Sequence, residues 1–295
     1  MSEPLVPRTD LAGRTALVTG SSRGLGAATA KRLGAMGADV IVTYRRNEDD
    51  AEAVAAAIKS IGRWAAHHPL EMSDPDSIHA LFDWIASDRG PDRLDVLVAN
   101  AAATSLKPLL DQKPHNIRTT MDICVTGFLT AVQRAVPLME AAGGGRIVAV
   151  SGIDTVSWAP AHGLLAAAKA AMESLVQYLN VEIGERGITT IGVNPDVFFG
   201  DSIRLMMGED FVDEAMKMVA RSHPLRVAAT PDDIAEVVAL LCTDAATWLS
   251  GNTVMADGAM SFASRGVTVA QGMQIATLKG RLAEDASGGP SVPDL

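Results

Sequence analysis

The stretch TGSSRGLG, residues 19–26, decides the fold of this chain. It comes at the end of an apolar run, RTALVTG (14–20), that is typical of a buried strand, and an Ala-rich helical segment follows it. Gly20 permits a tight turn, Gly24 lets the backbone approach a pyrophosphate, and Gly26 allows the helix to pack closely on the strand. The N–H groups and the positive end of the helix dipole favour a bound phosphate. The sequence therefore predicts a dinucleotide-binding turn.

Six more apolar runs follow along the chain, and most are separated from the next by a segment of helical composition. Nearly continuous apolar strands indicate a parallel sheet that is covered by helices on both faces. We therefore expect one doubly wound, Rossmann-type α/β domain with a seven-stranded parallel sheet. The six further strands are expected at 38–44, 64–70, 94–100, 145–151, 189–195 and 252–258.

The two ends of the chain are expected to lie outside this domain. Residues 1–11 are interpreted as an N-terminal tail and residues 12–262 as the domain itself. Residues 263–295 end in AEDASGGPSVPDL, which is small, polar and rich in Pro and Gly. This composition predicts a C-terminal extension that is partly disordered.

Composition excludes several classes of function. The chain has 295 residues and a formal net charge of −10, whereas a nucleic-acid groove needs clustered Lys and Arg. No apolar run reaches the roughly 18 residues of a membrane span, and the N-terminus lacks an apolar signal segment. Cys124 and Cys242 have neither disulfide nor metal-ligand spacing, so both are predicted to be buried, and no metal site is expected. We expect a soluble, cytoplasmic protein that binds neither nucleic acid nor membrane.

The end of the second predicted strand, TYRRNEDD (43–50), indicates which dinucleotide binds. NAD-binding sheets usually place an acid here for the ribose 2′-hydroxyl, whereas this chain has Arg45 and Arg46. Arg23 in the glycine turn adds a third guanidinium nearby. Guanidinium groups match the geometry of a 2′-phosphate, so the sequence favours NADP(H) over NAD(H). Two solvated arginines on an exposed loop are the alternative.

Several motifs together resemble the short-chain dehydrogenase/reductase family over about residues 10–262. They are TGSSRGLG, VANAAA (98–103) after the fourth strand, the late Lys169 and ADGAMS (256–261) after the last strand. The resemblance implies that Lys169 hydrogen-bonds the nicotinamide ribose and that residues 197–222 form a lid over an apolar substrate. A helix that only packs on the core is the alternative for this segment. With the glycine turn and the arginines, the expected cofactor contacts are Gly20, Ser22, Arg23, Gly24, Leu25, Gly26, Tyr44, Arg45, Arg46, Glu71, Met72, Asn100, Ala101, Ala102, Lys169, Pro195 and Val197.

The chain departs from the family at the positions of its usual catalytic residues, so the active site is expected to be atypical. An ordinary ketone reduction, in which a tyrosine protonates the alkoxide, is therefore not favoured. The residues found are Leu165 for the tyrosine, Gly152 for the serine, Cys124 for the helix asparagine, Asp196 for the glycine of Asn-Pro-Gly, and Gly200 for the following threonine.

The pattern is closest to the enoyl-(acyl-carrier-protein) reductase III branch, which carries its tyrosine seven residues before the lysine. NAAATSLKPLL, MEAAGGGRIV and KAAMESLVQYLNVEI resemble this branch, and seven residues before Lys169 is His162. If the helix begins near Pro160, then His162, Leu165 and Lys169 share one face, with about 10 Å between the first and the last along the axis. A nicotinamide ribose and a substrate carbonyl could lie between them. Histidine can donate a proton near neutral pH, so His162 or a water is expected to be the proton donor; a hydrogen-bonded histidine without chemistry is the alternative.

Other polar candidates follow the fifth strand, where ligand crevices of such sheets open. Ser151 and Asp154 could orient His162 or contact substrate, and loop capping is the alternative for each. Trp158 is expected either to wall the pocket or to pack in the core. The candidate catalytic residues are therefore Lys169, His162, Ser151 and Asp154.

Two functions are in competition. The first is an NADPH-dependent reductase of an activated alkene or carbonyl, acting on an enoyl or keto acyl thioester, linked to CoA or a carrier protein, or on a polyketide-like intermediate. The second is an NADP(H)-binding protein without redox chemistry, such as a cyclase, an isomerase or a ligand-binding scaffold.

The helix MESLVQYLNVEIGER (172–186) is apolar beyond one face, and in the family the equivalent helix pairs with its symmetry mate. We therefore expect a homodimer or a homotetramer.

Overall fold

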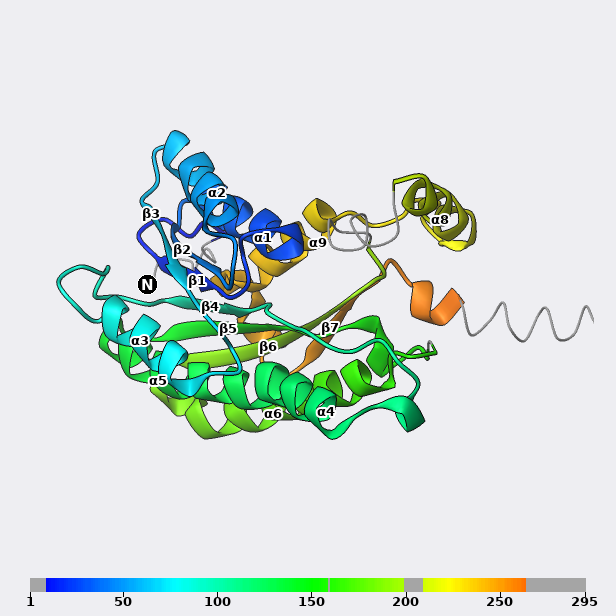
Figure 1. Ribbon diagram of the computed structural model, residues 1–295. Helices are drawn as coiled ribbons and strands as arrows, with labels where there is room; N and C mark the ends of the chain where they lie inside the picture. The colour runs from blue at the N-terminus through cyan, green and yellow to red at the C-terminus, as the bar shows by residue number, and fades with distance from the viewer. Residues whose placement is uncertain (1–8, 159, 199–208, 264–295) are drawn as a thin grey trace, which may run out of the picture.

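A parallel β-sheet forms the centre of the molecule. The computed structural model describes residues 9–158, 160–198 and 209–263. Seven strands lie in the order β3-β2-β1-β4-β5-β6-β7, and each pairs in parallel with its neighbours (Figure 1). This arrangement confirms the predicted Rossmann-type domain. The strands are β1 (Thr15–Val18), β2 (Asp39–Tyr44), β3 (Ala65–Pro69), β4 (Val96–Ala99), β5 (Gly145–Val150), β6 (Ile188–Pro195) and β7 (Thr253–Ala256).

Helices cover both faces of the sheet, with α1, α2 and α9 on one face and α3, α5 and α6 on the other (Figure 1). The α-helices are α1 (Gly24–Ala35), α2 (Glu48–Ser60), α3 (Pro75–Ile85), α4 (Pro114–Met121), α5 (Gly127–Ala141), α6 (Gly163–Ile183), α8 (Glu209–Ser222) and α9 (Pro231–Leu241). A π-helical turn, η2 (Asp122–Thr126), joins α4 to α5. Short 3-10 turns are η1 (Leu109–Asp111), η3 (Ile153–Thr155), η4 (Gly184–Arg186) and η5 (Asp244–Leu249).

Most strand residues are apolar because their side chains enter two cores. In β1, Val18 belongs to the cluster beneath α1, α2 and α9, whereas Leu17 belongs to the cluster beneath α3, α5 and α6. Cys242 lies in the first cluster and Cys124 in the second, as predicted for buried cysteines. Burial raises the pKa of the Cys242 thiol to about 12.

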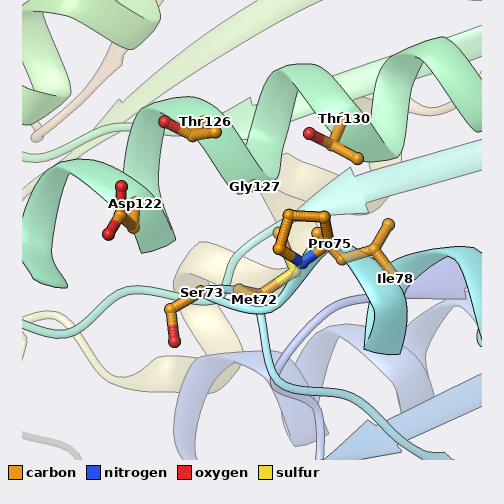
Figure 2. A pocket seen from close by; sticks show the side chains of 8 residues that line it. All are labelled: Met72, Ser73, Pro75, Ile78, Asp122, Thr126, Gly127 and Thr130. Carbon is orange, nitrogen blue, oxygen red and sulfur yellow. The ribbon is translucent and has the colours of Figure 1, made fainter.

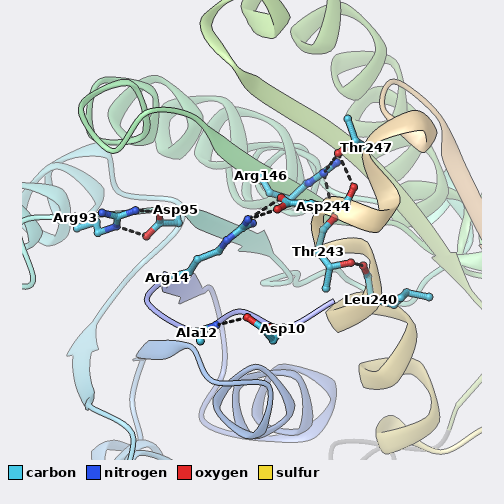
Figure 3. Close-up of polar contacts among 10 residues, drawn as sticks. All are labelled: Asp10, Ala12, Arg14, Arg93, Asp95, Arg146, Leu240, Thr243, Asp244 and Thr247. Atoms are coloured by element: carbon cyan, nitrogen blue, oxygen red, sulfur yellow. Dashed lines mark hydrogen bonds and ion pairs between the residues drawn. The ribbon is translucent and has the colours of Figure 1, made fainter. Parts of the chain in front are cut away.

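Charged side chains form contacts at the amino ends of the strands (Figure 3). Arg14 donates two hydrogen bonds to Asp244, at 2.7 and 2.6 Å, and Arg93 donates two to Asp95, at 2.8 and 2.7 Å. Arg146 in β5 is buried and donates to η5, and this burial lowers the pKa of its guanidinium. The contacts of Arg14 and Arg146 join the sheet to η5, the turn after α9, and serve the fold rather than the site.

The start of α6 differs from the sequence prediction. The helix begins at Gly163 rather than near Pro160, and Ala161 has a left-handed φ of 68°. A left-handed residue cannot continue a right-handed helix, so Pro160 and Ala161 form a turn before it. His162 is therefore the N-cap residue, and its carbonyl accepts the N–H of Ala166 at 3.0 Å.

The predicted tails and lid are only partly covered by the described residues. Leu11, at the end of the predicted N-terminal tail, is completely buried. Residues 199–208 of the predicted lid and 264–295 of the C-terminal extension lie outside the described residues, and α8 forms the later part of the lid segment. None of the helices in the described ranges is long and apolar enough to cross a membrane.

Candidate active site

The glycine turn lies at the carboxyl end of β1 with the geometry that the sequence predicts. Gly20 and Gly24 have left-handed φ angles of 64° and 55°, which glycine adopts without steric cost. A Cβ on Gly26 would lie 2.3 Å from the carbonyl oxygen of Gly20, so only glycine fits at this position. A Cβ on Gly24 would meet no atom within 4 Å, so the turn is open on that side.

The open turn fits the pyrophosphate of a dinucleotide. Arg23 is the N-cap residue of α1, but its side chain makes no capping hydrogen bond. Because the first N–H groups of a helix have no carbonyl partner within it, this end of α1 presents donors to an anion. Ser22 is half-buried and Leu25 is buried, while Arg23 is exposed.

The turn is fixed to the segment that follows β4. The Asn100 amide donates to the carbonyls of Thr19 and Gly20, at 3.0 and 3.2 Å. The backbone N–H groups of Asn100 and Ala101 both donate to Thr19 Oγ1 at 3.0 Å. Two segments that the resemblance assigns to the cofactor thus lie side by side, and Ala102 follows them in an exposed position.

The arginines predicted for the 2′-phosphate lie at the ends of β1 and β2. These ends are joined because Gly20 N–H donates to Thr43 Oγ1 at 2.9 Å. Arg23, Arg45 and Arg46 are exposed. Arg45 Nε lies 3.3 Å from a carboxylate oxygen of Glu71, the residue expected beside the adenine. The sequence did not anticipate this ion pair, which orients Arg45 toward the adenine side.

The other predicted cofactor residues occupy the same edge of the sheet. Tyr44 ends β2, is half-buried, and its ring lies 6.0 Å from that of His67. Met72 is buried. At the end of β6, Pro195 is buried while Val197 is exposed.

Lys169 is buried in the middle of this edge. Its ammonium donates to the carbonyl oxygen of Val150, at 2.5 Å. Burial lowers the pKa of Lys169, and nearby Cys124, Glu173 and Asp154 oppose that change. Cys124 lies in the π-helical turn η2, a type of distortion that is frequent at functional sites.

His162 and Asp154 form a pair at the mouth of a cavity. Nδ1 of His162 lies 3.0 Å from Asp154 Oδ1, so the structure brings two predicted catalytic residues together. The imidazole is partly exposed, and Nε2 has no hydrogen-bond partner among the described residues. The cavity has a volume of about 310 Å³ and is lined by Leu109, Asp154, Trp158, Pro160, Ala161, His162, Gly163 and Ala166.

The structure decides the alternative for Trp158 and places Leu165. Trp158 is 85% exposed and lines the cavity, so it does not pack in the core. Leu165 packs against the apolar cluster under α3, α5 and α6, and Gly163 and Ala166 line the cavity instead.

Sequence reasoning missed the polar cluster behind this pair. The carboxylate of Glu173 in α6 accepts hydrogen bonds from Ser151 and from Thr155, the latter at 2.9 Å. Asn194 in β6 donates to Thr155 Oγ1 at 2.8 Å and to Glu173 at 3.3 Å. Ser151, a predicted catalytic residue, is therefore part of this cluster. Glu173 follows Lys169 by four residues on the same helix face, a spacing that could have revealed it.

A second missed pair lies at the end of β6. Asp196 and His223 are 2% and 4% exposed, and their Oδ2 and Nε2 atoms are 3.2 Å apart. His223 Nδ1 accepts the N–H of Leu225 at 3.0 Å, so Nε2 carries the proton of a neutral ring. Burial raises the pKa of Asp196, while contacts with Val197 and His223 partly oppose this effect. Asp196 thus joins the sheet to the end of α8 instead of extending into open space.

A further cavity lies between α5 and the segment that enters α3 (Figure 2). It has a volume of about 240 Å³ and contains none of the predicted catalytic residues. Met72 is shared with the predicted adenine side. The lining residues are Met72, Ser73, Pro75, Ile78, Asp122, Thr126, Gly127 and Thr130.

The fold, the glycine turn and the buried lysine define a nicotinamide-dependent oxidoreductase. Residues 20–261 match the family model described as enoyl-(acyl carrier protein) reductase. The chain belongs to the short-chain dehydrogenase/reductase family, as the resemblance predicted.

Relatives in this family act on varied substrates. The 1-cyclohexenylcarbonyl-CoA reductase of Streptomyces collinus is 33% identical over 261 residues, which are 88% of this chain and 91% of the relative. The angucycline C-6 ketoreductase LanV, solved with bound NADP, is 30% identical with a TM-score of 0.78, over 86% of this chain and 97% of that one. A 7α-hydroxysteroid dehydrogenase complexed with NADH and 7-oxo glycochenodeoxycholic acid is 28% identical with a TM-score of 0.77, over 85% and 95%.

Proposed function

We propose that this chain is an NADPH-dependent reductase of an activated alkene or carbonyl, with His162 as the proton donor. The observation that carries the proposal is the His162–Asp154 pair at the mouth of an apolar-walled cavity. The substrate is an enoyl or keto acyl thioester, linked to CoA or a carrier protein, or a polyketide-like intermediate. A relative named as a CoA-thioester reductase and a neighbour named as a ketoreductase support this range.

The geometry assigns distinct roles to Asp154 and His162. The carboxylate of Asp154 accepts a hydrogen bond from Nδ1–H, so protonated His162 donates its other proton from Nε2. The bound cofactor supplies a hydride, which adds to the β-carbon of an enoyl thioester or to the carbonyl carbon of a ketone. His162 gives its proton to the resulting enolate or alkoxide, and the partly exposed imidazole regains a proton from water.

Lys169 and the cavity wall complete the site. The ammonium of Lys169 supplies positive charge beside the reacting groups, which stabilises developing negative charge in a buried environment. Leu109 and Trp158 give the cavity an apolar wall that suits an acyl chain or an aromatic polyketide. The hydroxyl of Ser151 donates a hydrogen bond to Glu173, so we assign Ser151 to the support of the site and not to proton transfer.

One observation favours the second function, a cofactor-binding protein without redox chemistry. The ammonium of Lys169 is directed to the carbonyl of Val150 and is buried. In this alternative, His162 has no role in turnover, and Lys169 contributes only to cofactor affinity.

The two functions are separated by following NADPH consumption with a panel of enoyl and β-keto thioesters. We expect turnover with at least one of them, reduced by His162→Ala and by Lys169→Ala. The reductase is contradicted if no substrate consumes NADPH while NADP(H) still raises the melting temperature and Lys169→Ala abolishes that rise. This result would leave the binding protein as the function.

A further inference from the structure

The carboxylate of Glu173 accepts hydrogen bonds from three segments of the chain that belong to different elements. Its Oε1 atom accepts hydrogen bonds from Ser151 after β5, from Thr155 in η3 and from Asn194 in β6. Glu173 itself lies on α6, one turn after Lys169. One carboxylate oxygen therefore fixes the ends of two strands and the turn between β5 and α6.

Thr155 links Glu173 to the neighbouring residue Asp154. Its hydroxyl donates to Glu173 at 2.9 Å and accepts from Asn194 at 2.8 Å. Thr155 and Asp154 both belong to the three-residue turn η3, which is closed by the hydrogen bond from Thr155 N–H to the Gly152 carbonyl, at 3.2 Å. A turn this short has little freedom, so fixing Thr155 also fixes the backbone of Asp154, from which its carboxylate reaches His162.

Asp154 in turn holds His162, so α6 contacts η3 at two places. The first is the N-cap residue His162, and the second is Glu173, eleven residues later and about 16 Å further along the axis. We propose that Glu173 is a positioning residue that sets the tautomer and orientation of His162 through Thr155 and Asp154. This inference rests on the proposed function only for its effect on turnover, because the tautomer can be observed directly.

Asn194 restrains η3 from a second strand. Its side-chain amide donates to Thr155 Oγ1 at 2.8 Å and to Glu173 at 3.3 Å. Because Asn194 is buried in β6, these two hydrogen bonds join η3 and α6 to the sheet.

The test is to weaken the anchor while leaving Asp154 and His162 unchanged. Thr155→Val removes the connecting hydroxyl, Glu173→Ala removes the acceptor, and Glu173→Gln retains an acceptor oxygen as a conservative rescue. Glu52→Ala is the matched control, because Glu52 is an exposed helical carboxylate on α2. The readouts are the ¹⁵N chemical shifts of the His162 ring, assigned by comparison with His162→Ala, and kcat and KM.

In the wild type we expect the neutral His162 ring to carry its proton on Nδ1. Thr155→Val and Glu173→Ala should populate the other tautomer and lower kcat roughly 10- to 100-fold, with KM nearly unchanged. Glu173→Gln should retain most of the wild-type tautomer and turnover, and Glu52→Ala should match the wild type.

The tautomer decides the outcome. If Thr155→Val, folded as judged by its melting temperature, keeps the wild-type ring shifts, then the proposal is overturned, even if Glu173→Ala fails to fold. If the shifts change as expected but the wild type reduces no substrate, then the positioning role stands and the proposed reductase function fails.

Discussion

At the scale of single residues, His162 and Leu165 differ in what they can contribute to the reaction. His162 lines the cavity and is paired with Asp154, whereas Leu165 packs into the core cluster. We expect His162→Ala to lower kcat by roughly 10²–10⁴-fold, the usual contribution of general acid catalysis. Leu165→Tyr, which restores the usual residue of the family, should not raise turnover, because a larger ring at this position crowds the packed cluster.

Leu165→Met is the control for this comparison, since it keeps the volume and apolar character of the side chain. Its steady-state kinetics should match those of the wild type. A gain of turnover in Leu165→Tyr would contradict the assignment of His162 as the proton donor, because it would show that the cavity accepts a tyrosine at the usual position.

Asp196 gives a pH-dependent contribution to stability. Burial raises the pKa of Asp196 in the folded state, with His223 and Asp257 as the ionisable groups facing it. The folded state therefore disfavours the carboxylate, and stability falls as pH rises from the ordinary pKa of aspartate through the raised one. Asp196→Asn removes this penalty and leaves the contact of His223 Nε2 with the Asp257 carbonyl, at 3.2 Å, unchanged. We expect the free energy of unfolding to increase by roughly 1–2 kcal/mol at neutral pH.

Urea denaturation of both proteins between about pH 4 and pH 7 measures this effect. The advantage of Asp196→Asn should shrink toward the acid end of the range, as the pH falls through the raised pKa of the folded state toward the ordinary pKa of aspartate. An advantage that is independent of pH would mean that the ionised carboxylate is not disfavoured by the fold. As a control, Asp88→Asn changes an exposed surface carboxylate in the segment that follows α3 and is measured in parallel.

At the scale of elements, we expect the turns after β1 and β2 to determine the cofactor preference. They carry the three exposed arginines, of which Arg45 is oriented by Glu71. We expect NADPH to bind at least about tenfold more tightly than NADH, since a charge-assisted contact contributes roughly 1.5–3 kcal/mol. The double variant Arg45→Ala/Arg46→Ala should lose this preference when both cofactors are titrated.

The control for that titration is Arg89→Ala, an exposed arginine at the other end of the sheet that should leave the NADPH/NADH ratio unchanged. Equal affinities of the wild type for the two cofactors would contradict the preference. One similar solved structure contains NADP and another contains NADH, so the cofactor preference of this chain must be measured on the chain itself.

The elements themselves were largely predictable from sequence. All seven strands were located, because continuous apolar runs between helical segments have few other interpretations. The start of α6 was predicted too early because proline is common in the first turn of a helix, which favoured a start near Pro160. Nothing in the sequence reveals the left-handed φ of Ala161. Contacts between distant segments were not predictable: the pairing of Asp196 with His223 depends on the path of the chain through α8.

At the scale of the whole molecule, α6 has an apolar surface beyond the one that it buries. Leu179 and Ile183 are buried against the sheet, whereas Tyr178 and Val181 are 66% and 83% exposed. Exposed apolar side chains grouped on one helix face indicate an interface with another protein surface. We propose that this face pairs with its counterpart in a second copy, which gives a homodimer or a homotetramer with two-fold symmetry.

Val181→Glu tests this assembly because it places two like charges opposite each other across a two-fold interface. Light scattering at micromolar concentration should show a dimer or tetramer for the wild type and a smaller species for the variant. Ile61→Glu, at an exposed apolar residue that follows α2, is the control and should keep the wild-type mass. A monomeric wild type would contradict the interface. Because α6 also carries Lys169 and Glu173, the dissociated Val181→Glu variant should have both a lower melting temperature and a lower turnover than the wild type.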